Sequence, residues 1–471
     1  MNVLDPFLKH VKGRPETPAL ISESGTMSYR ALEQASLERA ASFTAQGIQQ
    51  GDHVLVLETL SADLYVTLLA LFRTGAVAVF PDASQGLAGV ANASEQVPIK
   101  AFIAPLWLRL IKLFLRPLRR LPSLSKRPQK ATEGPLFSKV PNDHPALITF
   151  TSGSTGRPKG IVRSHGFLLE QHRMLIETLD PQQGDVDLIS LPIFILSNLG
   201  SGITSVLPAG DIRSPEKVLA EPIIQQIKTH AVNRLILPPA FCRRLCQTGH
   251  TLEKLNKVFT GGGPVYPNDL RSIKEMAPNA DVITIFGSTE AEPIAHSALS
   301  ETSDEDFQAM ENGAGLLAGH IAPGTELRLV DDEIVVSGDH VVKGYLNPED
   351  NVTTKILENG KVWHKTGDAG RLDEDGRLWL LGRLTARSQD QFPFCIEAAA
   401  LSIPGVEKAA YMATQGSEYL LVELSSEAAT PLKRLQDKFP NLNIKPLKLP
   451  MDKRHNSKID YDRLKEMLEN A

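Results

Sequence analysis

Cysteine is scarce in this chain, which has three cysteines among 471 residues. Two of them, Cys242 and Cys246, are four residues apart, but the pair lacks the further ligands of a zinc set, so two buried thiols on one helical face are expected. A small and odd number of cysteines is typical of a reducing compartment and gives no basis for a disulfide framework. We therefore expect a cytoplasmic protein.

The chain also lacks a large excess of charge of either sign, and it lacks long apolar runs. Its net charge is −5, which gives no reason to expect a nucleic-acid partner. The longest apolar stretch, residues 64–80, is interrupted by Arg73 and Gly75, which predicts a buried helix leading into a strand rather than a membrane span. The first six residues have no basic region followed by an apolar core, so no signal peptide is predicted.

Acidic residues are missing from one segment, residues 105–130, where Arg and Lys alternate with apolar residues at helical spacing. Two interpretations stay open for this segment. A basic amphipathic helix can lie on an anionic membrane surface, which would be useful with a lipid substrate. A surface helix packed on its own domain is the more common case, and we favour it.

Helical and strand patterns alternate along the first hundred residues. Strands are predicted at 52–57 and 76–80, and helices begin near Ser28 and span 64–73. Such alternation predicts an α/β fold in which helices cover both faces of parallel-type sheets. A β-rich part is expected at 326–383, with a hairpin whose turn contains an Asp-Gly pair.

The most informative stretch, residues 151–160, reads TSGSTGRPKG and follows the buried-strand pattern of 146–150. Glycine lets a backbone pass close to a ligand, successive N–H groups cradle anions, and hydroxyls can follow phosphate oxygens. The pattern is neither a Walker loop nor a dinucleotide fingerprint. It predicts a polyphosphate site formed by Thr151, Ser152, Gly153, Ser154, Thr155, Gly156 and Lys159.

This stretch resembles the signature loop of the adenylate-forming, or AMP-binding, enzymes: acyl-CoA synthetases, luciferase-like proteins and adenylation domains of nonribosomal peptide synthesis. The resemblance implies ATP and Mg²⁺ as cofactors and a catalytic role for Thr155. It also implies a large multi-subdomain AMP-binding domain over 1–383, a hinge near 384–386, and a small α+β domain over 384–471.

Two further stretches extend the resemblance. Residues 259–264 are expected to follow a helix, and they resemble the glycine turn beside the adenine, although alone such a turn is weak evidence. Residues 285–290 resemble the motif in which an aromatic residue packs on adenine, threonine contacts the α-phosphate and glutamate serves Mg²⁺, a cation that prefers hard oxygen ligands. Glu290 is thereby implied as a catalytic metal ligand, and the implied nucleotide-binding residues are Gly261, Gly262, Gly263, Phe286, Gly287, Ser288 and Thr289.

The last motifs concern the ribose and the transition state. Asp368, in Thr366-Gly367-Asp368, matches the carboxylate that binds both ribose hydroxyls, a suitable role for an acceptor of two donors. Arg383 resembles the arginine that ends the large domain. Lys458 matches the mobile lysine that bridges the attacking carboxylate and the α-phosphate, where it stabilises growing negative charge.

Residues 191–202 indicate the chemical class of the substrate, because the matching residues of the resembled family line the acyl pocket. Phe194, Leu196 and Asn198 are expected to contribute to it. No acidic residue lies between Leu188 and Gly210, so an α-ammonium group would be left unpaired, and an apolar acyl chain is expected instead. No glycine lies between Arg383 and Gly405, whereas CoA-ligating members place one there beside the pantetheine tunnel. CoA as a cosubstrate is therefore doubted.

The variations resemble one branch of the family. Residues 202–208, Thr385 and 454–459 are similar to the β-lactone synthetases of bacterial olefin biosynthesis. That resemblance implies adenylation of a long-chain β-hydroxy acid and displacement of AMP by its own hydroxyl. An acyl-CoA synthetase, a stand-alone peptide-synthetase-type enzyme and an inactive nucleotide-binding homologue remain alternatives. By their chemistry, His165, His296 and His455 are candidates for the base, and each could equally be structural.

Overall fold

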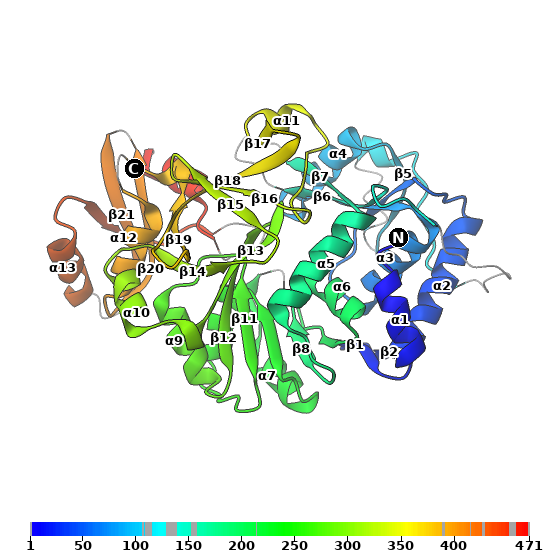
Figure 1. The fold of residues 1–471 in the computed structure, drawn as a ribbon, viewed down its shortest axis with the longest axis horizontal. Coiled ribbons are helices and arrows are strands. Elements are labelled where there is room, and N and C mark those ends of the chain that lie inside the picture. The colour runs from blue at the N-terminus through cyan, green and yellow to red at the C-terminus, as the bar shows by residue number, and fades with distance from the viewer. Residues whose placement is uncertain are drawn as a thin grey trace. The chain divides into compact units, whose positions relative to one another are not determined.

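The computed structural model describes residues 2–105, 108, 115–128, 139–151, 158–212, 214–388, 391–414, 416–425, 429–451 and 458–469. It divides into two compact units. The first unit comprises Met1–Ala209, Thr289–Glu292 and Gly338–His364, and the second comprises Gly210–Ser288, Pro293–Ser337 and Lys365–Ala471. Each unit combines sheets with covering helices, so the α/β fold class predicted from the alternation is confirmed (Figure 1).

One sheet of the first unit has the strand order β5-β3-β4-β6-β7. Its strands are β3 (His53–Val56), β4 (Val77–Phe80), β5 (Ile99–Ile103), β6 (Pro145–Thr151) and β7 (Lys159–Ser164). Neighbours pair in parallel except β7, which is antiparallel to β6. Helix α3 (Ala62–Thr74) connects β3 to β4. The Ser61 hydroxyl caps its first turn, and Gly75 ends it in a left-handed conformation.

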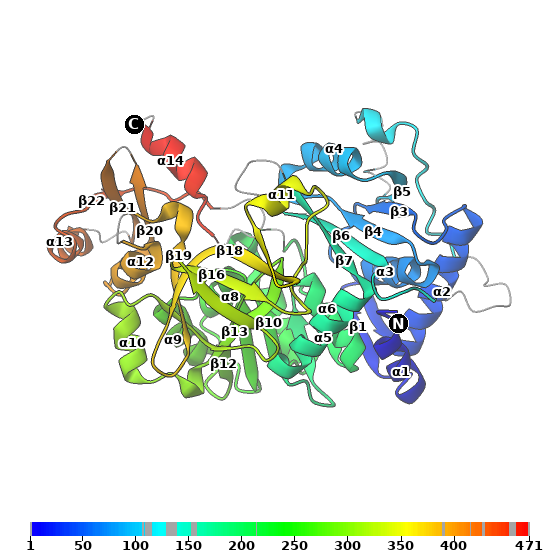
Figure 2. The same cartoon turned by 45° about the horizontal axis from the view of Figure 1, so that its top comes forward.

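A second sheet of the first unit has the order β8-β9-β1-β2. Its strands are β1 (Pro18–Ser22), β2 (Gly25–Ser28), β8 (Val186–Ile189) and β9 (Thr204–Val206). Three helices matter for the site: α1 (Asp5–Gly13), α5 (His165–Leu179) and α6 (Pro192–Ser201). They lie side by side in Figures 1 and 2. Helix α2 (Tyr29–Ala45) begins at the predicted position, where Ser28 accepts a hydrogen bond from the N–H of Ala31.

The second unit contains three parallel strands followed by antiparallel ones. The parallel strands are β10 (Arg234–Leu237), β11 (Lys257–Gly261) and β12 (Asp281–Ser288), with helices α7 (Ala220–Thr229), α8 (Pro239–Cys246) and α9 (Pro267–Met276). The sheet continues in the order β13 (Ala291–Ala298), β14 (Leu316–Ile321), β19 (Leu378–Arg383), β18 (Lys361–Leu372), β16 (Glu333–Ser337) and β15 (Glu326–Val330). The predicted Asp-Gly turn connects β18 to β19.

The end of the chain forms a small three-stranded sheet with helices. Figure 2 shows its elements, which are α12 (Pro393–Leu401), β20 (Val406–Thr414), β21 (Ser417–Leu424), α13 (Ala429–Lys438), β22 (Asn443–Pro446) and α14 (Tyr461–Glu469). Residues on both sides of the predicted boundary contact each other within the second unit. The Tyr266 hydroxyl donates to Glu397 Oε2 at 2.7 Å, and Asn268 Nδ2 donates to the Leu401 carbonyl at 2.7 Å. A single 3₁₀ turn, Leu384–Ala386, occupies the predicted hinge, and the division after Arg383 stays a prediction.

Two expectations from the sequence can be compared with the structure directly. The stretch 64–80 is a buried helix followed by a strand, as expected, and no helix among the described residues is long and apolar enough to cross a membrane. Much of 105–130 lies outside the described residues. In the part that is described, Leu118 is fully buried in the apolar cluster around Phe102 and Phe150, which agrees with packing on its own domain.

Candidate functional site

Glu290 lies in the turn between β12 and β13, two residues after the end of β12. A segment that we call the bridge segment, residues 341–346, runs beside it in the first unit. The Val342 N–H donates to the Glu290 carbonyl at 2.8 Å, and the Tyr345 hydroxyl donates to Glu290 Oε1 at 2.8 Å. The bridge segment therefore contacts both the backbone and the side chain of the predicted metal ligand.

The same bridge segment also pairs with strand β7, which begins at Lys159. Tyr345 forms an antiparallel bridge with Ile161, and the Leu346 N–H donates to the Gly160 carbonyl at 2.8 Å. A Cβ at Gly160 would lie 2.4 Å from Leu346 Cδ1, so any larger residue at this position would have to displace the Leu346 side chain. The ammonium of Lys159 is 5.5 Å from the centre of the Tyr345 ring, within cation–π range.

Two ends of the predicted phosphate loop are therefore placed by the structure. Thr151 ends β6 and is the cross-strand partner of Lys159, and both side chains are buried. Five predicted phosphate-binding residues in the centre of the loop lie outside the described residues. They are Ser152, Gly153, Ser154, Thr155 and Gly156.

The surroundings of Glu290 favour its ionised form. Burial opposes ionisation, but His364, the Tyr345 hydroxyl and Lys355 together hold the pKa of Glu290 below its ordinary value. Burial also lowers the pKa of His364 to about 4, so this imidazole is neutral at pH 7. Burial lowers the pKa of Lys355 to about 8 against the opposing effect of Glu290. At neutral pH the Tyr345 hydroxyl and the Lys355 ammonium therefore stabilise the Glu290 carboxylate more than His364 does, because the His364 imidazole is then uncharged.

The predicted ribose carboxylate belongs to the second unit. Asp368 on β18 is the direct cross-strand partner of Arg383 on β19, and Arg383 Nη1 lies 3.1 Å from Asp368 Oδ1. Gly367 has φ 73°, a left-handed conformation that favours glycine, and its N–H donates to Glu333 Oε1 at 3.0 Å. The register of one hairpin thus brings together two residues that the sequence predicted separately.

The predicted adenine residues lie at the carboxyl ends of β11 and β12. Gly261 and Ile285 are partners in the parallel pairing, and a Cβ at Gly261 would lie 2.2 Å from the Ile285 carbonyl oxygen. The expectation that this glycine turn follows a helix is wrong. Residues 259–261 form the end of strand β11, because Val258, Phe259 and Thr260, which are β-branched or aromatic, pair with β12. Phe286, Gly287 and Ser288 end β12 and are half-buried, whereas Gly262 and Gly263 continue the turn.

Lys458 lies in the second unit just before helix α14. Its neighbour Ile459 forms an isolated bridge with Met451, and the Asp460 N–H donates to the Pro450 carbonyl at 2.9 Å. These two contacts hold the segment that carries Lys458, whose side chain is exposed.

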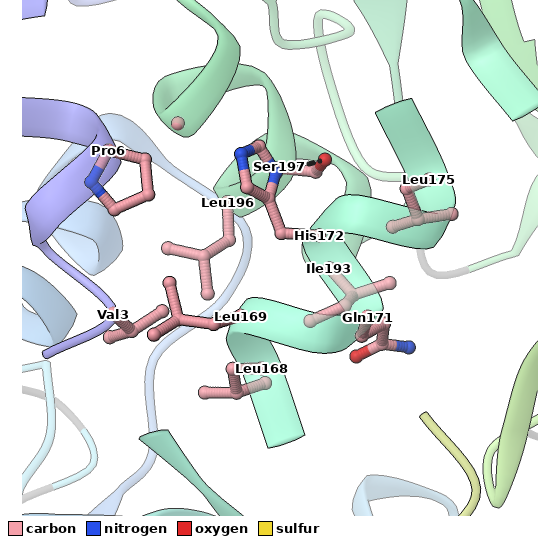
Figure 3. A pocket seen from close by; sticks show the side chains of 11 residues that line it. Val3, Pro6, Leu168, Leu169, Gln171, His172, Leu175, Ile193, Leu196 and Ser197 are labelled. Atoms are coloured by element: carbon pink, nitrogen blue, oxygen red, sulfur yellow. Dashed lines mark hydrogen bonds between the residues drawn. The ribbon is translucent and has the colours of Figure 1, made fainter. Parts of the chain in front are cut away.

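Helix α6 carries the residues predicted to line the acyl pocket. Leu196 lines a small cavity between α1, α5 and α6, which has room for about one water molecule (Figure 3). In this cavity Leu169 and Leu196 face each other, and His172 Nδ1 lies 2.9 Å from Ser197 Oγ. Phe194 and Asn198 do not line it, and both are buried.

The side chain of Asn198 is held by polar partners inside the first unit. Its Nδ2 donates to Asp187 Oδ2 at 2.8 Å and to Ser205 Oγ at 3.1 Å. Asp187 is fully buried, and it precedes the acid-free stretch 188–210 by one residue. This carboxylate is engaged by Asn198, so the structure gives it a packing role that the sequence interpretation missed.

Comparison with known proteins decides the family. The profile of the family described as "AMP-binding enzyme" matches residues 7–346. The chain belongs to this family. It is 28% identical to the olefin beta-lactone synthetase of Stenotrophomonas maltophilia and 29% identical to that of Xanthomonas campestris, in each case over 93% of this chain and 90% of the relative.

A solved structure supports the same conclusion at the level of the fold. O-succinylbenzoate coenzyme A synthetase (MenE) of Bacillus subtilis, in complex with ATP and magnesium ion, matches 98% of this chain and 99% of its own, with a TM-score of 0.80 and 22% identity. This AMP-binding enzyme is therefore an adenylate-forming, AMP-forming ligase that activates a small-molecule carboxylic acid, as its motifs predicted.

Two of the three candidate bases can now be placed. His165 is fully buried, accepts a hydrogen bond from the Val3 N–H at Nδ1, and stacks on His144. Burial lowers the pKa of His165 to about 4, so it behaves as a neutral core residue. His296 pairs with His320 across β13 and β14, and burial lowers its pKa as well. His455 lies outside the described residues.

The site residues that sequence reasoning missed are Tyr345, Lys355 and His364, all in the first unit with Glu290. Tyr345 is 55 residues from Glu290 and lies outside any helix or strand. No periodic pattern connects two such positions. The bridge segment brings them together, because it pairs both with β7 and with the backbone at Glu290 and Ala291.

Proposed function

We propose that this AMP-binding enzyme uses ATP and Mg²⁺ to convert a fatty or β-hydroxy fatty acid to an acyl-adenylate, and then closes a β-lactone. The observation that carries the proposal is the likeness to two olefin beta-lactone synthetases over 93% of the chain. The acid-free stretch 188–210 and the apolar residues of α6 support an alkyl substrate over an amino acid.

The first half-reaction joins the carboxylate of the acid to the α-phosphorus of ATP and releases pyrophosphate. In the proposal, Lys159 and the loop after Thr151 bind the phosphates, and Asp368 accepts hydrogen bonds from the ribose. Lys458 bridges the carboxylate and the α-phosphate, and preorganised positive charge at that point is the kind of interaction that lowers such a barrier most. The turn at Leu384–Ala386 is proposed as the hinge that brings Lys458 to the nucleotide.

Glu290 fits the requirements of Mg²⁺. This cation usually binds one or two carboxylates together with substrate phosphates and waters. Glu290 is a half-buried carboxylate whose surroundings keep it ionised. Among the residues that the structure describes, no group of three or more His, Cys, Asp or Glu side chains could hold a metal, which agrees with a cation bound mainly by the nucleotide. When bound, Mg²⁺ would neutralise charge on the phosphate oxygens.

The second half-reaction is proposed to be intramolecular. The β-hydroxyl oxygen of the acyl-adenylate attacks the acyl carbon, and the hydroxyl proton passes to solvent water or to the departing phosphate. The bond from that carbon to the phosphate oxygen breaks, and AMP leaves. A tethered nucleophile needs no tunnel for a second substrate, only a conformation that places it near the carbonyl. The absence of glycine between Arg383 and Gly405 agrees with an enzyme that does not admit pantetheine.

A fatty acyl-CoA synthetase is the second candidate, because the family also includes CoA ligases. The chain is 27% identical to the 2-succinylbenzoate–CoA ligase of Arabidopsis thaliana, and the match covers 57% of the present chain. This likeness covers less of the chain than the likeness to the olefin beta-lactone synthetases does, so the thioester is the less supported product.

Pyrophosphate release distinguishes these functions. The purified enzyme is assayed with ATP and Mg²⁺ against a β-hydroxy fatty acid, the matched fatty acid without the hydroxyl, and an amino acid, each with and without CoA. We expect release with both fatty acids, and a β-lactone detected by mass spectrometry only from the β-hydroxy acid and without CoA. A thioester that forms only with CoA would show that the enzyme is a fatty acyl-CoA synthetase rather than a β-lactone synthetase. No release with any acid would contradict both.

A further inference from the structure

A hydroxyl–carboxylate bond connects the bridge segment to the predicted metal ligand. The Tyr345 hydroxyl donates to Glu290 Oε1 at 2.8 Å, and the two side chains are half-buried or buried. Hydrogen bonds to an ionised acceptor are about twice as strong as neutral ones, and they restrict the plane of the carboxylate.

The ring of the same tyrosine contacts the phosphate-loop lysine. Lys159 Nζ lies 5.5 Å from the ring centre, and Lys159 is buried, so the ring replaces part of the water that would surround the ammonium. The backbone of Tyr345 is fixed independently: its N–H donates to Asn351 Oδ1 at 2.9 Å, and it bridges Ile161 on β7. One side chain therefore contacts both Glu290 and Lys159 from a backbone that is held at two points.

We propose that Tyr345 is a positioning residue that aligns Glu290 for Mg²⁺ and Lys159 for the ATP phosphates. Outer partners of metal ligands orient the ligand, and their loss typically costs about 10–100-fold in metal affinity or activity. The inference rests on the first half of the proposed function, namely that Glu290 and Lys159 serve Mg²⁺ and ATP. It does not depend on the β-lactone step.

The variant Tyr345→Phe tests the hydroxyl and keeps the ring. Mn²⁺ serves as the probe for the metal and is titrated in the presence of ATP by electron paramagnetic resonance. We expect the affinity for Mn²⁺ to fall about tenfold or more. Binding of ATP in the presence of EDTA, measured by calorimetry, should stay within about twofold, because the ring still faces Lys159.

The chain offers a matched control for this variant. The Tyr411 hydroxyl donates to Glu418 Oε1 at 2.6 Å within the β20–β21 pair, so Tyr411→Phe removes the same kind of bond in the small terminal sheet. This control should leave Mn²⁺ affinity unchanged. An equal loss of Mn²⁺ affinity in both variants, or no loss in Tyr345→Phe, would overturn the inference.

Two further variants separate positioning from folding. In a Glu290→Gln background, Tyr345→Phe should cause no further loss of Mn²⁺ affinity, because residues that act through each other are not additive. Tyr345→Leu, which also removes the ring, should additionally weaken ATP binding in EDTA. If the unmodified enzyme itself binds no Mn²⁺ with ATP, the proposed function fails; if it binds Mn²⁺ and Tyr345→Phe binds it equally, only the present inference fails.

Discussion

Arg383 Nη1 lies 3.1 Å from Asp368 Oδ1, across the β18–β19 pair in which the two residues are direct partners. Arg383 Nη1 also donates to the Thr366 carbonyl at 3.1 Å. The Arg383 side chain is 53% exposed, so the ion pair contributes little to stability. The ion pair instead orients Asp368, because a guanidinium bonded to one carboxylate oxygen restricts how the carboxylate can turn toward a ligand.

The first prediction concerns Asp368. Replacing it by alanine should raise the dissociation constant of ATP about tenfold or more, because each lost hydrogen bond to a charged acceptor is worth about 1.5–3 kcal/mol. Calorimetric titration with ATP measures the change. Asp375→Asn in the exposed turn between β18 and β19 is the control and should bind ATP as the unmodified enzyme does. Equal ATP affinity in Asp368→Ala would exclude Asp368 from the nucleotide site.

The second prediction concerns Lys458. Lys458→Ala should lower the rate of pyrophosphate release by about 10²–10³, the typical cost of removing one donor that acts on transition-state charge. ATP affinity should change little, since the proposed contact forms mainly as charge accumulates. Lys465→Ala, on the exposed face of helix α14, is the control. A rate loss matched by an equal loss of ATP affinity would instead indicate ground-state binding.

The third prediction concerns the acid sensitivity of the second unit. Arg377 binds both oxygens of Asp306 at 2.9 Å. Burial opposes ionisation of Asp306, but Arg377 and the Ser303 N–H hold its pKa below the ordinary value. The ionised form is thus favoured by folding, so this contribution to stability is present above about pH 4 and is lost as the pH falls through the lower folded-state pKa.

Asp306→Asn provides the measurement for this third prediction. Urea unfolding is followed from pH 3 to pH 7 for the variant and the unmodified enzyme. We expect the variant to be less stable at pH 7, and the difference in unfolding free energy to shrink below about pH 4. A difference that stays constant over this range would show that the pairing with Arg377 does not depend on ionisation of Asp306.

The fourth prediction concerns Gln171, which lines the small cavity between α1, α5 and α6. Gln171 is 2% exposed, and its Oε1 has no hydrogen-bond partner within the part of the chain that the structure describes. A buried polar atom without a partner typically costs about 1–3 kcal/mol. Gln171→Leu should therefore raise the unfolding free energy by about 1 kcal/mol, measured by urea denaturation. A destabilised variant would show that the amide has a partner that the leucine cannot replace.

The sequence by itself determined the local features of this protein. The helix 62–74 is bounded by a serine cap and a left-handed glycine, and the turn between β18 and β19 contains the Asp-Gly pair. The order of the phosphate, adenine, ribose and lysine motifs was sufficient to predict the family that the profile confirms. Such features are readable because they depend on residues a few positions apart, whose spacing reflects the backbone geometry directly.

Only the tertiary structure decided which residues act on one another across the chain. It placed Tyr345 beside Glu290 and Lys159, paired Asp368 with Arg383, engaged Asn198 with Asp187, and buried His165 as a neutral core residue. It also assigned residues 259–261 to a strand end. These contacts depend on strand register and on the burial of each group, and both arise from the packing of distant segments, which no local pattern of residues encodes.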